Sequence, residues 1–175
     1  APSDMSFSVQ APRRSGQGRL EWSGQSLSTV FTQRRNLLSP DFWSMLADIV
    51  RFNRLTTAMA AAGKETELKQ AIGAFLDEHR FGTAFREDYF LPMVACIWSC
   101  PTEQMLRYPM ATMIRFCHNH GLLQVTNRPQ WFTVAGGSRE YVRQLVRRLD
   151  DTRLNTPVRA VTRQAAGVTV HTDQG

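Results

Sequence analysis

The order of the periodic segments constrains the fold of this chain more than any other feature of its sequence. Apolar residues recur at helical spacing through the middle of the chain, between Ser39 and Gly121. Segments of alternating apolar and polar residues, typical of half-buried strands, lie at both ends, at residues 5–9, 19–22, 130–134, 157–161 and 167–171. Strands confined to the two ends do not give the strand–helix alternation of a doubly wound domain. The sequence therefore predicts an α+β fold that is mainly helical in its middle.

The longest predicted helix has the clearest start. Ser39 is a good N-cap residue and Pro40 is well tolerated at the first helical position, so we expect a helix from there to about Ala60. We expect its buried face to contain Phe42, Trp43, Leu46, Ile49 and Val50. The charged residues left for solvent are Asp41, Asp48, Arg51 and Arg54.

Further helices are expected along the rest of the middle segment. Residues 65–78 carry one continuous apolar stripe, and residues 84–98 form a denser apolar stretch that Pro92 should kink or divide. A helix over 109–119 should end at Gly121. After the strand at 130–134, Ser138 should cap a helix whose buried stripe is made by Val142, Leu145, Val146 and Leu149.

Composition is that of an ordinary globular chain and excludes several classes of protein. Of the 175 residues, 42% are hydrophobic and 21% are charged, which argues against extensive disorder. Three cysteines, an odd number, argue against a disulfide scaffold. No apolar run is long enough to cross a bilayer and no signal peptide opens the chain, so we expect a cytoplasmic protein without a membrane span.

The net charge of +6 comes almost entirely from arginine, since Lys64 and Lys69 are the only lysines. Such an excess can indicate a nucleic acid or another anionic partner. No recognised basic motif accompanies the charge, so nucleic acid is not the expected partner. A small basic helical module that binds nucleic acid or protein remains the alternative to the function developed below.

The last forty or so residues carry the strongest similarity to a known family. They read "WFTV", "AGGS", an amphipathic "REYVRQLVRRL" and then "TPVRAVTRQAAGVTVHTDQG". This order resembles the flavin amine-oxidase superfamily, which includes protoporphyrinogen oxidase and the phytoene desaturases. Upstream, the strings "MSFSV", "LEW", "RRNLL", "FWSML", "RFN", "IWSCP" and "FCHNHGLL" resemble a bacterial branch described as predicted NAD/FAD-binding or amine-oxidase-like oxidoreductases.

The resemblance implies an FAD-dependent oxidoreductase that removes hydride from a C–N or C–C bond of an apolar or amine-containing substrate. Residues 1–135 would then form the substrate-binding domain, and residues 136–175 the hinge, helix and partial hairpin of an FAD-binding domain. A Gly-x-Gly-x-x-Gly loop that opens a helix after a strand, which would hold the pyrophosphate, is absent from the sequence. We therefore expect an internal fragment that neither holds FAD nor acts alone, and that self-associates through the surface its missing FAD-binding domain would cover.

Three positions take their expected roles from this resemblance. Val158 matches a strand position whose backbone contacts the adenine end of FAD, although an ordinary buried strand residue would look the same. Gly136 and Gly137 match an inter-domain hinge, because glycine allows a sharp turn at positive φ, although a simple loop would also use them. No side chain is expected to act as an acid or base, because in this family the flavin carries the redox chemistry.

The string from Cys117 to Gly121 allows more than one interpretation. A metal site with Cys96, Cys100 and His118 fits no standard zinc spacing, so no metal is expected. Histidine before a glycine is typical of a capped helix end. A third interpretation, which rests on the resemblance, places polar and aromatic side chains against the substrate cavity. Its candidates are Tyr89, Phe116, His118, Asn119 and His120, each of which could equally be an ordinary core or cap residue.

Overall fold

The computed structural model describes residues 1–16, 18–124 and 129–174, and within them the chain forms two compact units. The larger unit covers Asp4–Trp131, and the smaller combines Ala1–Ser3 with Phe132–Gly175. The elements of the larger unit are β2 (Ser8–Pro12), β3 (Arg19–Ser23), α1 (Leu27–Val30), η1 (Arg34–Leu38), α2 (Pro40–Ala61), η2 (Lys64–Glu67), α3 (Ile72–Glu78), α4 (Thr83–Phe85), η3 (Arg86–Phe90), α5 (Leu91–Trp98), α6 (Thr102–Met105) and α7 (Met110–Asn119). Helices in the middle and paired strands towards both ends confirm the predicted α+β fold.

The N-terminal hairpin pairs β2 with β3 in antiparallel register. Val9 lies opposite Trp22, and Ala11 lies opposite Leu20. Because side chains alternate along a strand, Val9, Leu20 and Trp22 all face inward and are buried. Both predicted strands are present, although the first begins at Ser8 instead of Met5.

The long helix α2 begins where its sequence predicts. The hydroxyl of Ser39 accepts a hydrogen bond from the backbone N–H of Phe42 at 3.3 Å, and Pro40 occupies the first turn. The predicted buried face was wrong at two positions, because Trp43 and Val50 are 49% and 40% exposed. The residues that α2 buries are Phe42, Met45, Phe52, Asn53 and Thr56.

The apolar stripe predicted as one helix over 65–78 is divided into η2 and α3. Backbone bonds to the segment before α7 hold the break: Ile72 N–H donates to the carbonyl of Tyr108 at 2.9 Å, and Gly73 N–H to that of Leu106 at 2.8 Å. Met110 N–H donates in return to the carbonyl of Gln70 at 3.0 Å. These bonds between distant segments replace helical bonds, so the stripe alone could not predict the division.

The disturbance expected at Pro92 takes the form of a π-helical turn. The turn, η3, joins α4 to α5, and Pro92 lies in the first turn of α5. Proline has no N–H, so it cannot bond the carbonyl of Asp88 four residues earlier. The indole Nε1–H of Trp22 donates to that carbonyl at 3.3 Å, which attaches the hairpin to the helix.

The helix α7 ends in a Schellman motif at the predicted glycine. Gly121 has φ +64°, its N–H donates to the carbonyl of His118 at 3.1 Å, and Leu122 N–H donates to that of Cys117 at 2.9 Å. A Cβ at Gly121 would lie 2.7 Å from Cδ of Pro129. Both the backbone conformation and the neighbouring ring therefore require glycine here.

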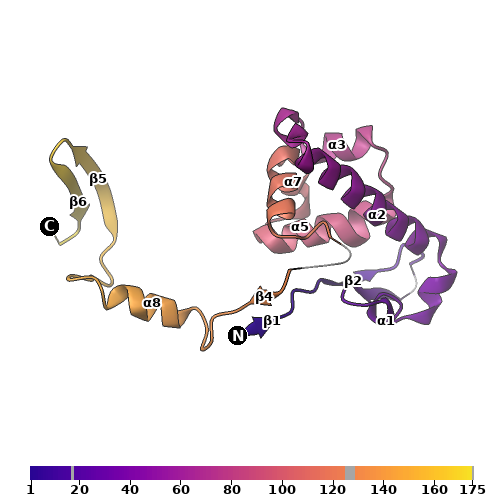
Figure 1. Ribbon diagram of the computed structural model, residues 1–175, viewed down its shortest axis with the longest axis horizontal. Coiled ribbons are helices and arrows are strands. Elements are labelled where there is room, and N and C mark those ends of the chain that lie inside the picture. The colour runs from indigo at the N-terminus through magenta and orange to yellow at the C-terminus, as the bar shows by residue number, and fades with distance from the viewer. Residues whose placement is uncertain (17, 125–128, 175) are drawn as a thin grey trace. The chain divides into compact units, whose positions relative to one another are not determined.

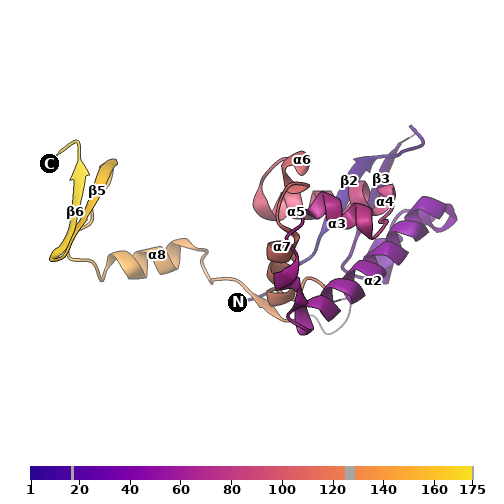
Figure 2. The same cartoon turned by 90° about the horizontal axis from the view of Figure 1, so that it is seen from above.

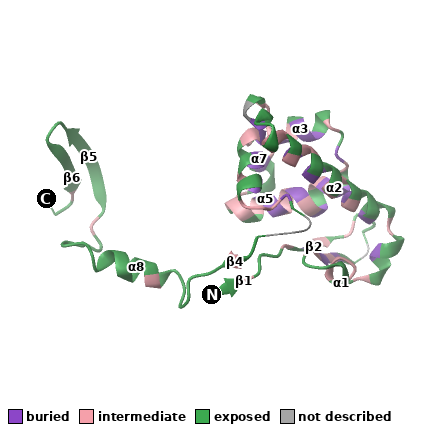
Figure 3. Ribbon diagram, viewed as in Figure 1, coloured by how far each residue is buried: buried purple, intermediate pink, exposed green. Residues whose placement is uncertain are grey.

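The main core of this unit surrounds Phe52 on α2. Helix α2 packs against α4 and α7 (Figures 1 and 2). Buried residues in Figure 3 are concentrated on these helices and on the hairpin. The largest fully buried side chains are Phe52, Phe75, Phe85, Phe90, Met45, Ile72, Leu76, Met105, Met110, Met113, Ile114 and Val94.

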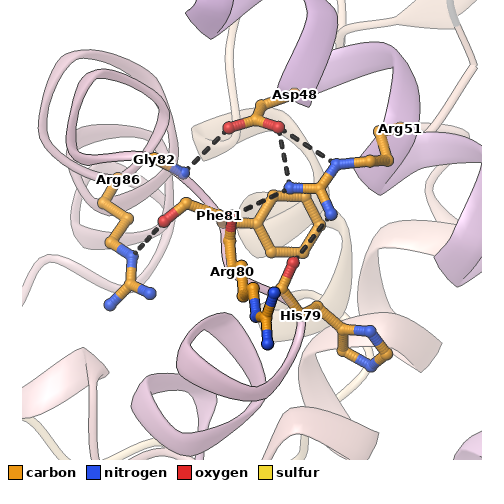
Figure 4. A network of polar contacts seen from close by, with 7 residues as sticks. All are labelled: Asp48, Arg51, His79, Arg80, Phe81, Gly82 and Arg86. Carbon is orange, nitrogen blue, oxygen red and sulfur yellow. Dashed lines mark hydrogen bonds and ion pairs between the residues drawn. The ribbon is translucent and has the colours of Figure 1, made fainter.

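A polar network fixes the loop after α3 to the side of α2 (Figure 4). Asp48 accepts hydrogen bonds from the Arg51 guanidinium at 2.8 and 3.0 Å and from Gly82 N–H at 2.8 Å. Arg51 also donates to the carbonyl of His79 at 2.7 Å and lies 4.0 Å from the ring centroid of Phe81. The prediction that Asp48 is left for solvent was wrong, because its carboxylate is largely buried by these contacts.

The smaller unit contains β1 (Pro2–Ser3), α8 (Arg139–Val146), β5 (Val158–Gln164) and β6 (Gly167–Thr172), and β4 (Trp131–Phe132) lies at the boundary, with Trp131 in the larger unit. Strand β1 pairs with β4, and β5 pairs with β6 as the predicted C-terminal hairpin. The strand predicted over 130–134 is only two residues long. Ser138 precedes α8, but its side chain makes no capping bond among the described residues.

Candidate functional site

Aromatic side chains gather around the C-terminal end of α7. The rings of Phe116 and His120 stack with centroids 4.1 Å apart, and Trp98 lies 4.6 Å from Phe116. Trp131 stacks with His120 at a centroid distance of 6.2 Å, and Tyr108 contacts Trp98 at 5.5 Å. We call these five residues the α7 aromatic cluster. Their side chains are all partly exposed, so they form a patch that an apolar ligand could contact.

The helix itself fixes the imidazole in this cluster. Phe116 and His120 are four residues apart, so they lie on the same face of α7. Nδ1 of His120 lies 2.8 Å from the carbonyl oxygen of Phe116, and this bond requires the hydrogen on Nδ1. Nε2 is then the nitrogen left to accept a hydrogen bond.

The structure brings together only two of the five cavity candidates. Phe116 and His120 belong to the α7 aromatic cluster, whereas His118 and Asn119 are exposed on the last turn of the helix. Tyr89 lies in a different aromatic group, 6.1 Å from Phe7, 5.9 Å from Trp22 and 5.6 Å from Phe85. Spacing along one helix could predict the Phe116–His120 contact, but no sequence signal indicated the partners of Tyr89.

The cysteines are not arranged as a metal site. Cys117 is buried, and burial raises the pKa of its thiol to about 12, which keeps it protonated and unsuited to metal binding. Cys96 is exposed, and the thiol of Cys100 lies 2.9 Å from the sulfur of Met105. Among the residues that the structure describes, no three His, Cys, Asp or Glu side chains are grouped to bind a metal ion.

A small pocket lies between the N-terminal hairpin, the start of α2 and Asp88 of η3. Arg14 forms ion pairs with Glu87 and Asp88, each at 3.1 Å, and donates to the carbonyl of Thr83 at 2.9 Å. The residues that line the pocket are Arg13, Arg14, Ser15, Leu20, Ser39, Asp41, Phe42, Met45 and Asp88. Its volume of about 90 Å³ is well below the several hundred Å³ of typical small-molecule sites. Sequence analysis did not indicate this pocket, because its residues come from three distant segments.

The two glycines predicted to form a hinge both adopt the left-handed conformation. Gly136 has φ +81° and Gly137 has φ +84°, values that residues with a Cβ rarely adopt. A Cβ at Gly136 would also lie 3.0 Å from Cγ of Glu140. The backbone therefore requires glycine at Gly136 for two reasons, and at Gly137 for its conformation alone.

Val158 begins β5 and is 58% exposed, so it is not an ordinary buried strand residue. It pairs with Thr172, and the register shifts between Val158 and Ala160. Arg159 in this bulge forms a bidentate pair with Asp173, and the bonded carboxylate raises the pKa of Arg159 while the guanidinium lowers that of Asp173. FAD needs a pyrophosphate cradle in addition to one strand position, so the residues present here do not fit FAD by themselves, and no catalytic step through FAD follows from them.

Several large apolar residues of the smaller unit are exposed, and Figure 3 shows α8 and the hairpin of β5 and β6 mostly in the colour of exposed residues. The stripe predicted to be buried on the segment that begins with α8 is exposed instead: Val142, Leu145, Val146 and Leu149 are 42–59% exposed. On the hairpin, Val161 lies opposite Val170, and both are exposed together with Val168. The prediction failed because no other described part of the smaller unit packs over this face of α8. We call these seven residues the uncovered apolar residues.

No helix within the described residues is long and apolar enough to cross a membrane. Comparison with curated proteins gives no match, and comparison with solved structures gives none. The family described as flavin containing amine oxidoreductase matches residues 20–175, which includes the helical core, α8 and the C-terminal hairpin. The chain therefore belongs to the flavin-containing amine oxidoreductase family.

Proposed function

We propose that this chain forms the substrate-side part of an FAD-dependent oxidoreductase of the amine-oxidase type. The family match over residues 20–175 carries the proposal. Under it, residues 1–135 form the substrate-binding domain, and residues 136–175 contribute the hinge, a helix and a partial hairpin to an FAD-binding domain. The substrate is an amine or another apolar molecule that loses hydride from a C–N or C–C bond.

In this proposal the α7 aromatic cluster forms part of the substrate cavity wall. Trp98, Phe116 and Trp131 would exclude water and contact the apolar part of the substrate. Nε2 of His120 would accept a hydrogen bond from an ammonium or amine group, because Nδ1 is already engaged with the carbonyl of Phe116. His118, Asn119 and Tyr89 remain candidates for other parts of the wall.

The flavin would supply the hydride acceptor, and this chain would supply orientation and a dry environment. The backbone of Val158 is the proposed contact with the adenine end of FAD, and the pyrophosphate would be held by a Gly-rich loop outside residues 1–175. The uncovered apolar residues support this proposal, because an FAD-binding domain that packs on them would bury surface now open to water. The paired glycines Gly136 and Gly137 would allow the chain to turn between the two domains.

The protein translated from the whole reading frame around this segment tests the proposal. We expect a Gly-x-Gly-x-x-Gly loop in that frame and a purified protein that carries flavin, whose absorbance is lost when an amine substrate is added without oxygen. Absence of both the loop and the flavin would contradict the proposal. In that case the small basic binding module would be the better description, and salt-dependent binding of nucleic acid would be the first measurement.

Two matched variants of that protein test the cavity wall. Phe116→Leu should raise KM about tenfold, because the stacked ring that contacts the substrate is lost. Phe31→Leu is the control, since Phe31 is also partly buried and lies 5.8 Å from another ring, that of Phe42. Equal KM values for the two variants, at equal thermal stability, would show that Phe116 does not line the substrate cavity.

A further inference from the structure

Arginine is concentrated in the N-terminal hairpin and the turn that follows it. Residues 13–35 contain five arginines and one acidic residue, Glu21. The arginines are Arg13, Arg14, Arg19, Arg34 and Arg35. These arginines can form an anion-binding site only if the folded chain brings their guanidinium groups together. It does so for Arg13 and Arg35.

The guanidinium groups of Arg13 and Arg35 meet at one backbone carbonyl. Nε of Arg13 donates to the carbonyl oxygen of Arg19 at 3.1 Å, and Nη2 of Arg35 donates to the same oxygen at 2.8 Å. Nη2 of Arg13 also donates to Oε1 of Gln33 at 2.6 Å and to Oδ1 of Asn36, which is fully buried. The side chain of Arg13 is therefore held in place, and that of Arg35 lies beside it.

Neutral oxygens bind this pair of cations. A carbonyl and two amide oxygens accept the hydrogen bonds, and no described carboxylate lies within ion-pair distance of Arg13 or Arg35. Glu21, the one acidic residue between the two arginines in sequence, bonds the amide groups of Gln10 and Gln33. Partial burial, and then the neighbouring charge of Arg35, lower the pKa of Arg13. Two like charges held together cost free energy that a bound anion would recover.

Donor groups remain on both members of the pair. The bonds between described residues use Nε and Nη2 of Arg13 and Nη2 of Arg35, which leaves Nη1 of both and Nε of Arg35 for a ligand. Gly18 lies against Arg35, and a Cβ there would be 3.4 Å from Nη1 of that guanidinium. A larger residue at position 18 would therefore pack directly against the Arg35 guanidinium, whereas glycine leaves its Nη1 uncovered by a side chain.

We propose that Arg13 and Arg35 form a binding site for the phosphate or diphosphate group of a small molecule. Two planar guanidinium groups offer a charge of +2 and parallel N–H donors, which match a dianionic oxyanion better than a single carboxylate. The site is independent of the proposed flavin chemistry, because it lies wholly in residues 13–36 and uses no residue of the α7 aromatic cluster.

Isothermal titration calorimetry tests the proposal. The purified 175-residue chain is titrated with pyrophosphate in a phosphate-free buffer of low salt. We expect saturable binding that Arg35→Gln weakens about tenfold or more, because charge-assisted hydrogen bonds are lost. Arg34→Gln is the matched control: Arg34 is the adjacent exposed arginine, and its removal changes the net charge equally. This control should weaken binding no more than about twofold.

Three results would overturn the proposal. The first is no saturable binding of pyrophosphate by the unmodified chain. The second is an equal loss in Arg34→Gln and Arg35→Gln, which would indicate attraction by net charge alone. The third is tight binding of phosphatidylglycerol vesicles or of single-stranded RNA that pyrophosphate does not displace. The two arginines would then belong to a binding surface for a membrane or a nucleic acid.

Discussion

At the scale of single residues, the contact between Trp22 and Asp88 compensates for a donor that Pro92 lacks. Trp22 is buried, and its Nε1–H reaches the carbonyl of Asp88 from a strand 66 residues earlier in the chain. Arg14 bonds the carboxylate of the same residue. Asp88 therefore receives bonds from the hairpin through both its backbone and its side chain.

Trp22→Phe should lower the free energy of unfolding by about 1–3 kcal/mol, because it removes a buried N–H donor and with it the hydrogen bond to the Asp88 carbonyl. Trp43→Phe is the control. Trp43 also donates to a carbonyl, that of Leu37 at 2.9 Å, but is exposed, so water can replace the lost bond at little cost. Urea unfolding of both variants measures the difference, and an equal effect would contradict the importance of the Trp22 bond.

The three cysteines should differ in reactivity. With a pKa of about 12, the Cys117 thiol stays protonated at pH 8, whereas Cys96 is exposed and should react with a thiol reagent at once. Because the folded state holds the proton more tightly than the unfolded state, this group stabilises the fold below about pH 8.5 and loses that contribution as pH rises above it. Mass spectrometry after brief labelling should find Cys117 unmodified until urea is added.

At the scale of elements, the end of α7 depends on glycine for two reasons that can be separated. Gly121→Ala places a Cβ in the left-handed conformation and against Pro129. Gly63→Ala is the control, because Gly63 has nearly the same φ, +66°, but no atom lies within 4 Å of the added Cβ. We expect a loss of about 1 kcal/mol at Gly63 and clearly more at Gly121, measured by thermal unfolding.

Local signals predicted those elements whose boundaries are set by their own residues. Ser39 and Pro40 start α2, and Gly121 ends α7, because caps act within one turn of the helix. The helix predicted over 65–78 was wrong because bonds from residues near Tyr108 divide it. The contact between Phe116 and His120 was predictable because both residues lie on one helix. The contact between Arg13 and Arg35 was not, because it joins separate segments of the chain.

At the scale of the whole molecule, the sequence predicted the α+β class correctly. The main difference from the sequence-based expectation is the exposure of the uncovered apolar residues. Their periodicity on α8 was identified correctly, but periodicity indicates only which residues share a face. Whether that face is buried depends on a covering surface, and the described residues of the smaller unit provide none for α8. We expect the chain to self-associate through these exposed residues.

Leu145→Glu should reduce self-association, because it places a charge among the uncovered apolar residues. Val50→Glu is the control, since Val50 is a comparably exposed apolar residue on α2. Sedimentation velocity over a range of concentrations should show a smaller assembly for the first variant and an unchanged one for the second. A monomeric unmodified chain at high concentration would show that the exposed face does not drive association.

The bond from Trp22 to Asp88 also sets an order of events during synthesis. The hairpin leaves the ribosome first, but the carbonyl it must reach, and the carboxylate that Arg14 must reach, belong to a helix translated long afterwards. A nascent chain that ends before Asp88 would lack the acceptor of the Trp22 indole and the carboxylate that Arg14 bonds. Attachment of the N-terminal hairpin through these two bonds must therefore follow the translation of Asp88.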